Sequence, residues 1–395
     1  MHTQAQKIAV VVASGLCSAA LFTWLHRLSR PRETLGVDNT EAVEALLRAH
    51  ARPPKRDLAP EAEPWPPPLV REPLPREVAA KFYPAIDRPG YRFDPVRHVL
   101  REPNFRTRRP FDPHPDGGWL IQTNSLGLRE DEDPPAEAAD LCLLVLGDSQ
   151  TEGVCANGES FPNRLEALLS SRRANESIDV WNCGIGGTGP FHYLATLEGL
   201  FGLAPDVVIA MFYGGNDFLN TVALERYFNH RDPPNKPDPF LDEVEDKDLF
   251  SEALGFAELG QLAFFRRNYK DQRIAVGACA SVALELERQC SERGVRFLCA
   301  YLPPPLIAQP EVFAEERSRV LAYIEPRGMN LNLSQRLADE WIALLATNGL
   351  TVLDLRPYFL AAKQRLFWED EWHLDLAGNE FVAAILADAL EKKAF

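Results

Sequence analysis

The sequence has fewer basic than acidic residues, and its cysteines follow no recognisable pattern. Lys and Arg number 42 against 57 Asp and Glu, which gives a net charge of −15 at pH 7. Binding to a nucleic-acid backbone needs clustered positive charge, so this composition argues against a nucleic-acid partner. No pair among the seven cysteines has metal-ligand spacing, and Cys142, Cys183 and Cys299 lie in apolar runs where a free thiol acts as a small hydrophobic side chain. The sequence therefore predicts neither a disulfide framework nor a metal site.

Charge is also absent from residues 8–25, a mostly apolar run that reads IAVVVASGLCSAALFTWL. As a helix these residues would span about 27 Å, enough to cross a thin bilayer. No small-residue cleavage pattern follows cleanly, so we predict an uncleaved, single-pass membrane anchor over residues 1–29. A lipoprotein processing site at Cys17 is disfavoured because bulky Leu16 stands where a small residue is needed. The positive charges that follow the run would by themselves place the rest of the chain inside the cell.

Residues 30–115 are predicted to form a proline-rich neck and an irregular lead-in. Residues 39–50 could form one short helix, and prolines crowd the segment that follows. Proline at this density excludes helix interiors and favours extended conformation, so we predict a semi-rigid spacer rather than a ligand for a proline-recognition domain. Residues 81–118 show no clear period, and residues 119–124 are typical of a short strand packed beside the next domain.

From residue 116 to residue 395, apolar runs typical of buried strands alternate with helical patterns. The predicted strands are 141–146, 178–182, 206–212, 295–302 and 351–355. The predicted helices are 160–172, 190–202, 274–293, 333–347 and 376–392, with Ser160 and Asp375 as N-caps and Gly294 and Gly349 at helix ends. This alternation predicts a three-layer α/β/α domain with an open, five-stranded parallel sheet.

A long excursion separates the third predicted strand from the next predicted helix. Residues 218–272 contain an acidic, proline-rich run and an apolar cluster of Leu262, Phe264 and Phe265. A loop of this length near a site is often a lid or a substrate-binding insert. A peripheral decoration is an equally weighted alternative.

Four short polar segments follow strands of this predicted sheet. They are Gly147–Gly153 (GDSQTEG), Asn182–Thr188 (NCGIGGT), Gly214–Asp217 (GGND) and Asp370–His373 (DEWH). The first three follow the first three strands, and the last follows the fifth. Because ligands bind outside the carboxyl ends of the strands in such sheets, we expect all four segments at the same edge.

Ser149, His373 and Asp370 have the side chains of a nucleophile, a base and a carboxylate that orients the base. A serine hydroxyl attacks poorly unless a base takes its proton. Asp370 lies three residues before His373, so one turn can present the carboxylate to Nδ1 and leave Nε2 for Ser149. Asp354, after the fifth strand, is a weaker candidate for the orienting carboxylate.

Attack on a carbonyl builds negative charge on oxygen, which N–H donors held in place can stabilise. The candidate donors are the Ser149 and Gly187 backbone N–H groups and the Asn216 side-chain amide. Gly187 has no Cβ, which lets the main chain approach closely. Gly184 is the alternative if the second segment is registered differently. Asp217, like Asp148, is expected to brace its loop.

Together the four segments resemble the sequence blocks of the SGNH (GDSL-type) hydrolase superfamily, over about residues 141–394. The resemblance implies Ser149 as nucleophile, Gly187 and Asn216 as oxyanion donors beside the Ser149 N–H, and the Asp370–His373 pair. It also implies a flavodoxin-like sheet and hydrolysis of esters or thioesters without a cofactor. Gln150 stands where the family commonly has leucine, and the family's fourth block is not identified here.

The sequence thus predicts a membrane-anchored serine esterase that works through an acyl-serine intermediate. The resemblance favours an extracytoplasmic catalytic domain. The anchor and the proline-rich neck suggest a glycan, lipid or other small-molecule ester at the cell envelope as substrate. Two alternatives stay open: an O-acyltransferase that modifies an envelope polysaccharide, and a non-catalytic binding module. Related transferases often carry Asp-x-His, whereas Asp370 lies three residues before His373, which favours a hydrolase. The sequence does not indicate an oligomeric state.

Overall fold

The computed structural model describes residues 65–230, 256–369 and 371–392. The predicted anchor over residues 1–29 and most of the proline-rich neck lie outside these ranges. Within the ranges, no helix combines the length and the apolar character needed to cross a membrane. The single-pass topology therefore stays a prediction.

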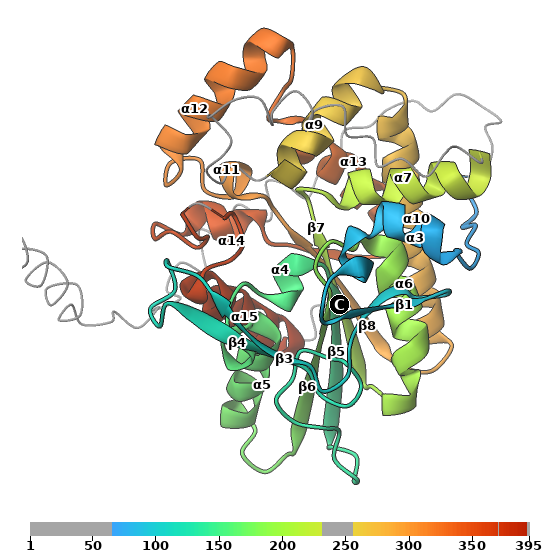
Figure 1. Cartoon of the computed structure of the whole chain (residues 1–395), viewed down its shortest axis with the longest axis vertical. Helices are drawn as coiled ribbons and strands as arrows, with labels where there is room; N and C mark the ends of the chain where they lie inside the picture. The colour runs from blue at the N-terminus through green and yellow to red at the C-terminus, as the bar shows by residue number, and fades with distance from the viewer. Residues whose placement is uncertain (1–64, 231–255, 370, 393–395) are drawn as a thin grey trace, which may run out of the picture. The chain divides into compact units, whose positions relative to one another are not determined.

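A five-stranded parallel sheet forms the centre of the fold (Figure 1). Its strands, in spatial order, are β6 (Ile178–Gly184), β5 (Leu141–Gly147), β7 (Val207–Tyr213), β8 (Arg296–Leu302) and β9 (Val352–Asp354). Every residue of β5 and β7 is buried, as expected for apolar strands covered on both faces. The predicted parallel sheet is confirmed, and its strand order is that of flavodoxin-like folds.

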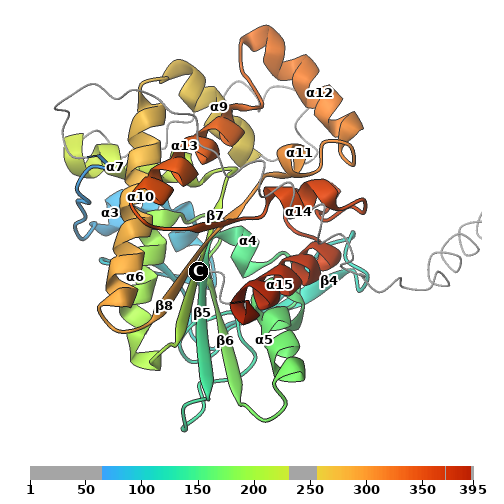
Figure 2. The ribbon, with the colours of Figure 1, turned by 180° about the vertical axis from the view of Figure 1, so that it is seen from behind.

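Helices cover both faces of the sheet, as predicted (Figure 1, Figure 2). On one face α5 packs against α15, and on the other α10 packs against α6, α7 and α13. Their bounds are α5 (Phe161–Arg172), α6 (Pro190–Leu200), α7 (Asp217–His230), α10 (Asp271–Ser291), α13 (Leu333–Thr347) and α15 (Leu376–Glu391). The amphipathic segments of the sequence therefore supply the two outer layers.

Local sequence signals set several of the helix ends. Asp375 caps α15, because its side chain accepts a hydrogen bond from the Gly378 N–H at 2.7 Å. Gly294 and Gly349 follow α10 and α13 with φ of 69° and 85°, the left-handed conformation that ends helices. Ser160 occupies the N-cap of α5, but its hydroxyl contacts Asn163 rather than a backbone N–H of the helix.

The lead-in before the sheet forms a helix and two antiparallel hairpins. These elements are α3 (Arg76–Phe82), β1 (Tyr91–Asp94), β2 (His98–Arg101), β3 (Arg106–Pro110) and β4 (Gly118–Gln122). Only β4 corresponds to a predicted strand, since the other strands are short and carry no periodic signal. Leu74, Phe82 and Val99 nevertheless lie in the same hydrophobic core as the sheet. The domain boundary after residue 115 stays a prediction, but lead-in and sheet share one core.

The excursion over residues 218–272 is largely helical where the structure describes it. It contains most of α7 and all of α9 (Phe256–Arg267), and residues 231–255 lie outside the described ranges. The apolar cluster of Leu262, Phe264 and Phe265 is buried in the main core. Further short helices that the sequence did not indicate are α11 (Pro305–Ala308), α12 (Ala314–Ile324) and α14 (Arg356–Ala361). A lid role for the excursion stays a prediction.

Candidate active site

Ser149 opens α4 (Ser149–Glu152), a single helical turn at the carboxyl end of β5 (Figure 1). Asp148 caps this turn by accepting a hydrogen bond from the Gln150 N–H at 2.9 Å. A Cβ at Gly147 would run into the side chain of Thr151, so only glycine allows the strand to enter the turn this closely. The strand and its glycine therefore place the serine at the edge of the sheet where the sequence predicted it.

His373 reaches Ser149 from the other end of the chain. Its Nε2 lies 2.7 Å from Ser149 Oγ, across 224 positions of sequence. The Trp368 N–H donates to the His373 carbonyl at 2.9 Å, which holds the backbone that carries the imidazole. A hydroxyl and an imidazole at this distance form the nucleophile–base contact that acyl transfer requires.

The carboxylate beside His373 is that of Glu371. Glu371 Oε2 lies 2.5 Å from His373 Nδ1, and the Glu371 carbonyl lies 3.2 Å from the same nitrogen. Asp370, the predicted orienting residue, lies outside the described residues. Asp354, the weaker candidate, instead binds Arg356 through both of its oxygens. Trp372 has a left-handed φ of 56°, and this turn brings a carboxylate two positions before the histidine to Nδ1.

The charges around His373 favour its protonated form. Burial disfavours the imidazolium, but the Glu371 carboxylate and Asp148 outweigh burial and raise the pKa of His373 above its ordinary value. Burial also raises the pKa of Asp148 to about 6, against the hydrogen bond from Gln150 and the charge of His373. The base is therefore prepared to hold the proton that it takes from the serine.

Gln150 holds the backbone on both sides of His373, a contact that the sequence did not suggest. Its Nε2 donates to the Trp372 carbonyl at 3.1 Å, and its Oε1 accepts from the Leu374 N–H at 3.1 Å. The Gln150 side chain is buried, with 2% of its surface exposed. Leucine, the common residue of the family at this position, could make neither hydrogen bond. Gln150 therefore ties the nucleophile turn to the base.

The second segment contains Gly187, the predicted oxyanion donor. Gly187 has φ of 76° and no atom within 4 Å of where a Cβ would lie, so glycine is needed for conformation rather than for space. The N–H groups of two other glycines are occupied: Gly184 donates to Asn182 Oδ1 at 3.0 Å and Gly186 to Glu152 Oε2 at 2.7 Å. The alternative donor Gly184 is thus engaged within its own loop.

Asn216 precedes α7, at the carboxyl end of β7. Its carbonyl accepts from the Asn220 N–H at 2.9 Å, which holds the residue at the start of the helix. Asp217 accepts hydrogen bonds from the Tyr193 hydroxyl at 3.0 Å and the Tyr213 N–H at 2.9 Å. Asp217 therefore braces the loop, as predicted. The Asn216 side chain interacts with Asp148, and its amide stays a candidate oxyanion donor because an amide nitrogen carries two N–H groups.

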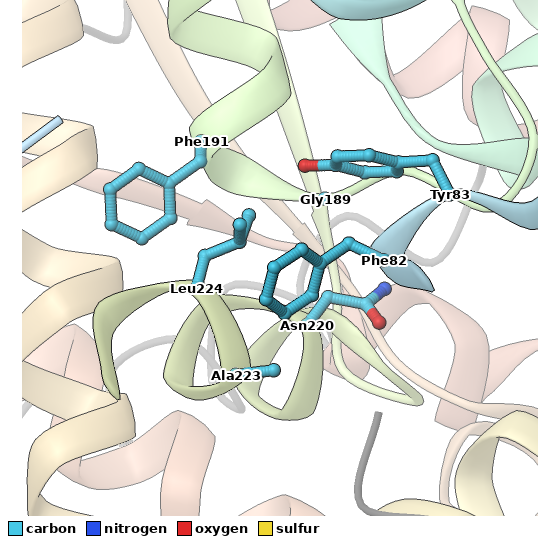
Figure 3. A pocket seen from close by; sticks show the side chains of 7 residues that line it. All are labelled: Phe82, Tyr83, Gly189, Phe191, Asn220, Ala223 and Leu224. Atoms are coloured by element: carbon cyan, nitrogen blue, oxygen red, sulfur yellow. The ribbon is translucent and has the colours of Figure 1, made fainter. Parts of the chain in front are cut away.

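A small pocket lies between α3, the start of α6 and α7 (Figure 3). Its cavity volume is about 10 Å³, and its lining residues are Phe82, Tyr83, Gly189, Phe191, Asn220, Ala223 and Leu224. Asn220 stands one helical turn beyond Asn216 and donates to the Thr188 carbonyl at 3.1 Å, one residue after Gly187. Figure 3 shows that Phe82 and Tyr83, which come from the lead-in, close one side of this mostly apolar space.

The described part of the chain contains no group of three or more His, Cys, Asp or Glu side chains that could hold a metal ion. Its six cysteines are free and buried, in line with the predicted role of Cys142, Cys183 and Cys299 as small hydrophobic residues.

The model of the GDSL-like Lipase/Acylhydrolase family matches residues 145–381, more than half of the chain. The chain belongs to this family. It is a serine ester hydrolase, and the resemblance drawn from the four polar segments is confirmed. The match begins within β5, so the lead-in residues 65–140 of this GDSL-like hydrolase lie outside it.

Several solved structures are similar to this GDSL-like hydrolase, whereas no curated protein matches it. A lipase/acylhydrolase from Enterococcus faecalis is 17% identical, with 64% of this chain and 96% of that chain covered and a TM-score of 0.36. The acetyl xylan esterase AlAXEase is 17% identical, with 63% and 99% covered and a TM-score of 0.34. The psychrotrophic esterase EstA from Pseudoalteromonas is 12% identical, with 65% and 99% covered and a TM-score of 0.37.

Proposed function

We propose that this hydrolase cleaves a carboxylic ester through an acyl intermediate on Ser149. The observation that carries the proposal is the 2.7 Å contact between Ser149 Oγ and His373 Nε2. His373 takes the hydroxyl proton as Oγ attacks the ester carbonyl, and it then gives that proton to the departing alcohol. His373 next takes a proton from water as the water oxygen attacks the acyl carbon, and it returns that proton to Ser149 Oγ as the carboxylic acid is released.

The oxyanion of each tetrahedral intermediate is stabilised by three donors in this mechanism. They are the Ser149 N–H, the Gly187 N–H and the Asn216 side-chain amide, each of which can contribute about 3–4 kcal/mol to the transition state. The positive φ of Gly187 and the occupied N–H groups of Gly184 and Gly186 support this selection.

Glu371 orients His373 in the proposed mechanism. Its carboxylate accepts the Nδ1–H, which leaves Nε2 unprotonated toward Ser149 and stabilises the imidazolium that forms. The predicted role of Asp370 as the orienting acid remains a competing proposal. Separate substitution of Glu371 and Asp370 distinguishes the two proposals.

The acyl group is proposed to be short. The pocket that borders Gly189 and Asn220 has a cavity volume of only about 10 Å³ and is bordered by Phe82 and Tyr83, so it suits an acetyl or similar small group better than a long chain. The charge-free run over residues 8–25 and the proline-rich neck support an anchored enzyme at the cell envelope, and the family resemblance supports an outward-facing catalytic domain, where an O-acetylated glycan would be the substrate.

Transfer of the acyl group to a sugar hydroxyl is the second candidate. The observation in its favour is the position of Glu371, because an acid two residues before the histidine has the spacing of related transferases. The same acyl intermediate would serve both reactions, and only the acceptor would differ.

The test uses the full chain, a fluorophosphonate probe and p-nitrophenyl esters from acetyl to octanoyl. We expect labelling and acetyl-ester hydrolysis that both disappear in Ser149→Ala but persist in Ser281→Ala, a partly buried serine on α10. Absence of labelling in folded wild-type protein would favour a non-catalytic module. Faster transfer to added sugar than to water would favour the transferase, and a preference for octanoyl would contradict a short acyl group.

A further inference from the structure

We propose that Arg101 and Glu152 act as a positioning pair for the oxyanion side of the active site. Arg101 lies on β2, in the lead-in and outside the residues matched by the family model. The proposal rests on the proposed function, since it explains how one of the donors for the Ser149 reaction is held in place.

Glu152 links the nucleophile turn to the loop that contains Gly187. It is the last residue of α4, three positions after Ser149. Its Oε2 accepts the Gly186 N–H at 2.7 Å, immediately before the candidate donor Gly187. A hydrogen bond from a backbone N–H to a carboxylate is among the stronger ones. The loop is thus held on both sides of Gly187, by Glu152 at Gly186 and by Asn220 at the Thr188 carbonyl.

Arg101 supplies the charge that lets Glu152 stay ionised inside the protein. Its guanidinium forms an ion pair with the other carboxylate oxygen of Glu152. The two side chains are only 6% and 8% exposed. A carboxylate at such a buried position is strongly destabilised unless an opposite charge faces it, and arginine stays protonated at all ordinary pH values. The lead-in thus determines the charge state of a residue that holds the loop.

The pair lies directly beside the nucleophile. A Cβ built on Gly186 would come 2.7 Å from Glu152 Oε2, 3.6 Å from Ser149 Cβ and 3.8 Å from the Tyr91 hydroxyl. The Arg101 guanidinium stacks over the Tyr91 ring, with 4.0 Å to the ring centre. Tyr91 and Arg101 are also paired across the β1–β2 hairpin. The hairpin therefore presents both side chains together to the space around Ser149 and the Gly186 loop.

Arg71 offers a matched control. It is also a lead-in arginine, and it also pairs with a glutamate of the helical layers, Glu198 on α6. Arg71→Met and Arg101→Met therefore each break one ionic contact between the lead-in and the rest of the fold. Only the Arg101–Glu152 contact leads to the Gly186 loop.

The experiment compares full-length wild type, Arg101→Met, Arg101→Lys and Arg71→Met. The readouts are kcat and KM for p-nitrophenyl acetate, thermal unfolding, and inhibition by 2,2,2-trifluoroacetophenone. This ketone accepts Ser149 Oγ at its carbonyl carbon while His373 takes the hydroxyl proton. The resulting hemiketal oxyanion occupies the oxyanion site, so inhibition reports on the donors without a leaving group.

Arg101→Met is expected to lower kcat by about 10²-fold and to weaken inhibition by the ketone in parallel, because one oxyanion donor is misplaced. KM should change little. Arg101→Lys, which keeps the charge, should recover a large part of both losses. Arg71→Met should keep wild-type kcat and inhibition.

A purely structural role gives a different outcome. Arg101→Met would then unfold at lower temperature while its folded fraction kept wild-type kcat and ketone inhibition, and the proposal would be overturned. If Arg101→Met does not fold, Glu152→Gln replaces it, with the same expected loss of kcat and inhibition. Wild-type protein that neither hydrolyses the ester nor reacts at Ser149 would contradict the proposed function itself, which is a distinguishable failure.

Discussion

The two sides of Ser149 are held in place by different kinds of contact. On the base side, Glu371 and His373 form an acid–imidazole pair whose side chains are 26% and 23% exposed. On the oxyanion side, Glu152 and Arg101 form a pair that is 8% and 6% exposed. The first pair contains a histidine whose pKa its neighbours raise, whereas the second contains an arginine that stays protonated at neutral pH.

This difference separates the sources of pH dependence and of transition-state stabilisation. Changes on the base side should alter the pH at which the enzyme gains activity, because His373 must be unprotonated to accept the serine proton. Changes on the oxyanion side should lower the rate at every pH and leave the pH at which the enzyme gains activity unchanged. The following predictions test this division, from the largest expected effect to the smallest.

Removal of the base should have the largest effect. His373→Ala is expected to lower kcat by at least about 10⁴-fold and to abolish rapid fluorophosphonate labelling, because among the described residues His373 is the base hydrogen-bonded to the Ser149 hydroxyl. The measurement is ester hydrolysis, with circular dichroism to establish that the variant is folded. Residual activity within tenfold of wild type would place the base elsewhere.

Removal of the side-chain oxyanion donor should lower the rate without moving the pH profile. Asn216→Ala is expected to reduce kcat by about 10²–10³-fold. Asn229→Ala, near the other end of the same helix, serves as the control. If the acid limb of the pH–rate profile shifted in Asn216→Ala, the amide would be acting through His373. The proposed division between the base side and the oxyanion side of Ser149 would then be wrong.

Substitution of the two neighbouring acids should identify the one that orients His373. Glu371→Gln is expected to lower kcat/KM by about 10²-fold, less than for a fully buried triad acid because Glu371 is partly exposed. The Glu371 carboxylate raises the pKa of His373, so its loss should move the acid limb of kcat/KM to lower pH.

Asp370→Asn is the comparison variant for this prediction, and it should change kcat/KM by less than about threefold, because Glu371 already occupies His373 Nδ1. The opposite ranking, with Asp370→Asn the more damaging variant, would return the orienting role to the acid that the sequence indicated.

Loss of the Gln150 contacts should have the smallest of these effects. Gln150→Leu removes two hydrogen bonds around His373 and is expected to lower kcat about tenfold through misplacement of the imidazole. Gln309→Leu is the control, because Gln309 is equally buried and holds the backbone of Gln364 and Leu366 in the same way, without touching His373. Equal kcat losses in both variants would mean that only general stability had changed.

The regular part of the fold was predictable because each element has its own local signal. The five sheet strands are mainly apolar runs, and helices beside them carry caps and end glycines in the sequence. The lead-in hairpins were not predictable in this way. Arg106–Pro110 in β3 is exposed throughout and contains three arginines, so it pairs with β4 through its backbone without an apolar period.

The sequence by itself determined which strand ends would carry polar side chains, and with them the meeting of Ser149 and His373 at one edge of the sheet, since parallel strands direct their carboxyl ends to the same side. Only the tertiary structure decided which side chains hold these two residues. The left-handed turn at Trp372 selects Glu371 for Nδ1, and the packing of β2 brings Arg101 to Glu152, 51 positions away. Contacts of this kind depend on backbone conformation and on long-range packing, which residue spacing alone does not contain.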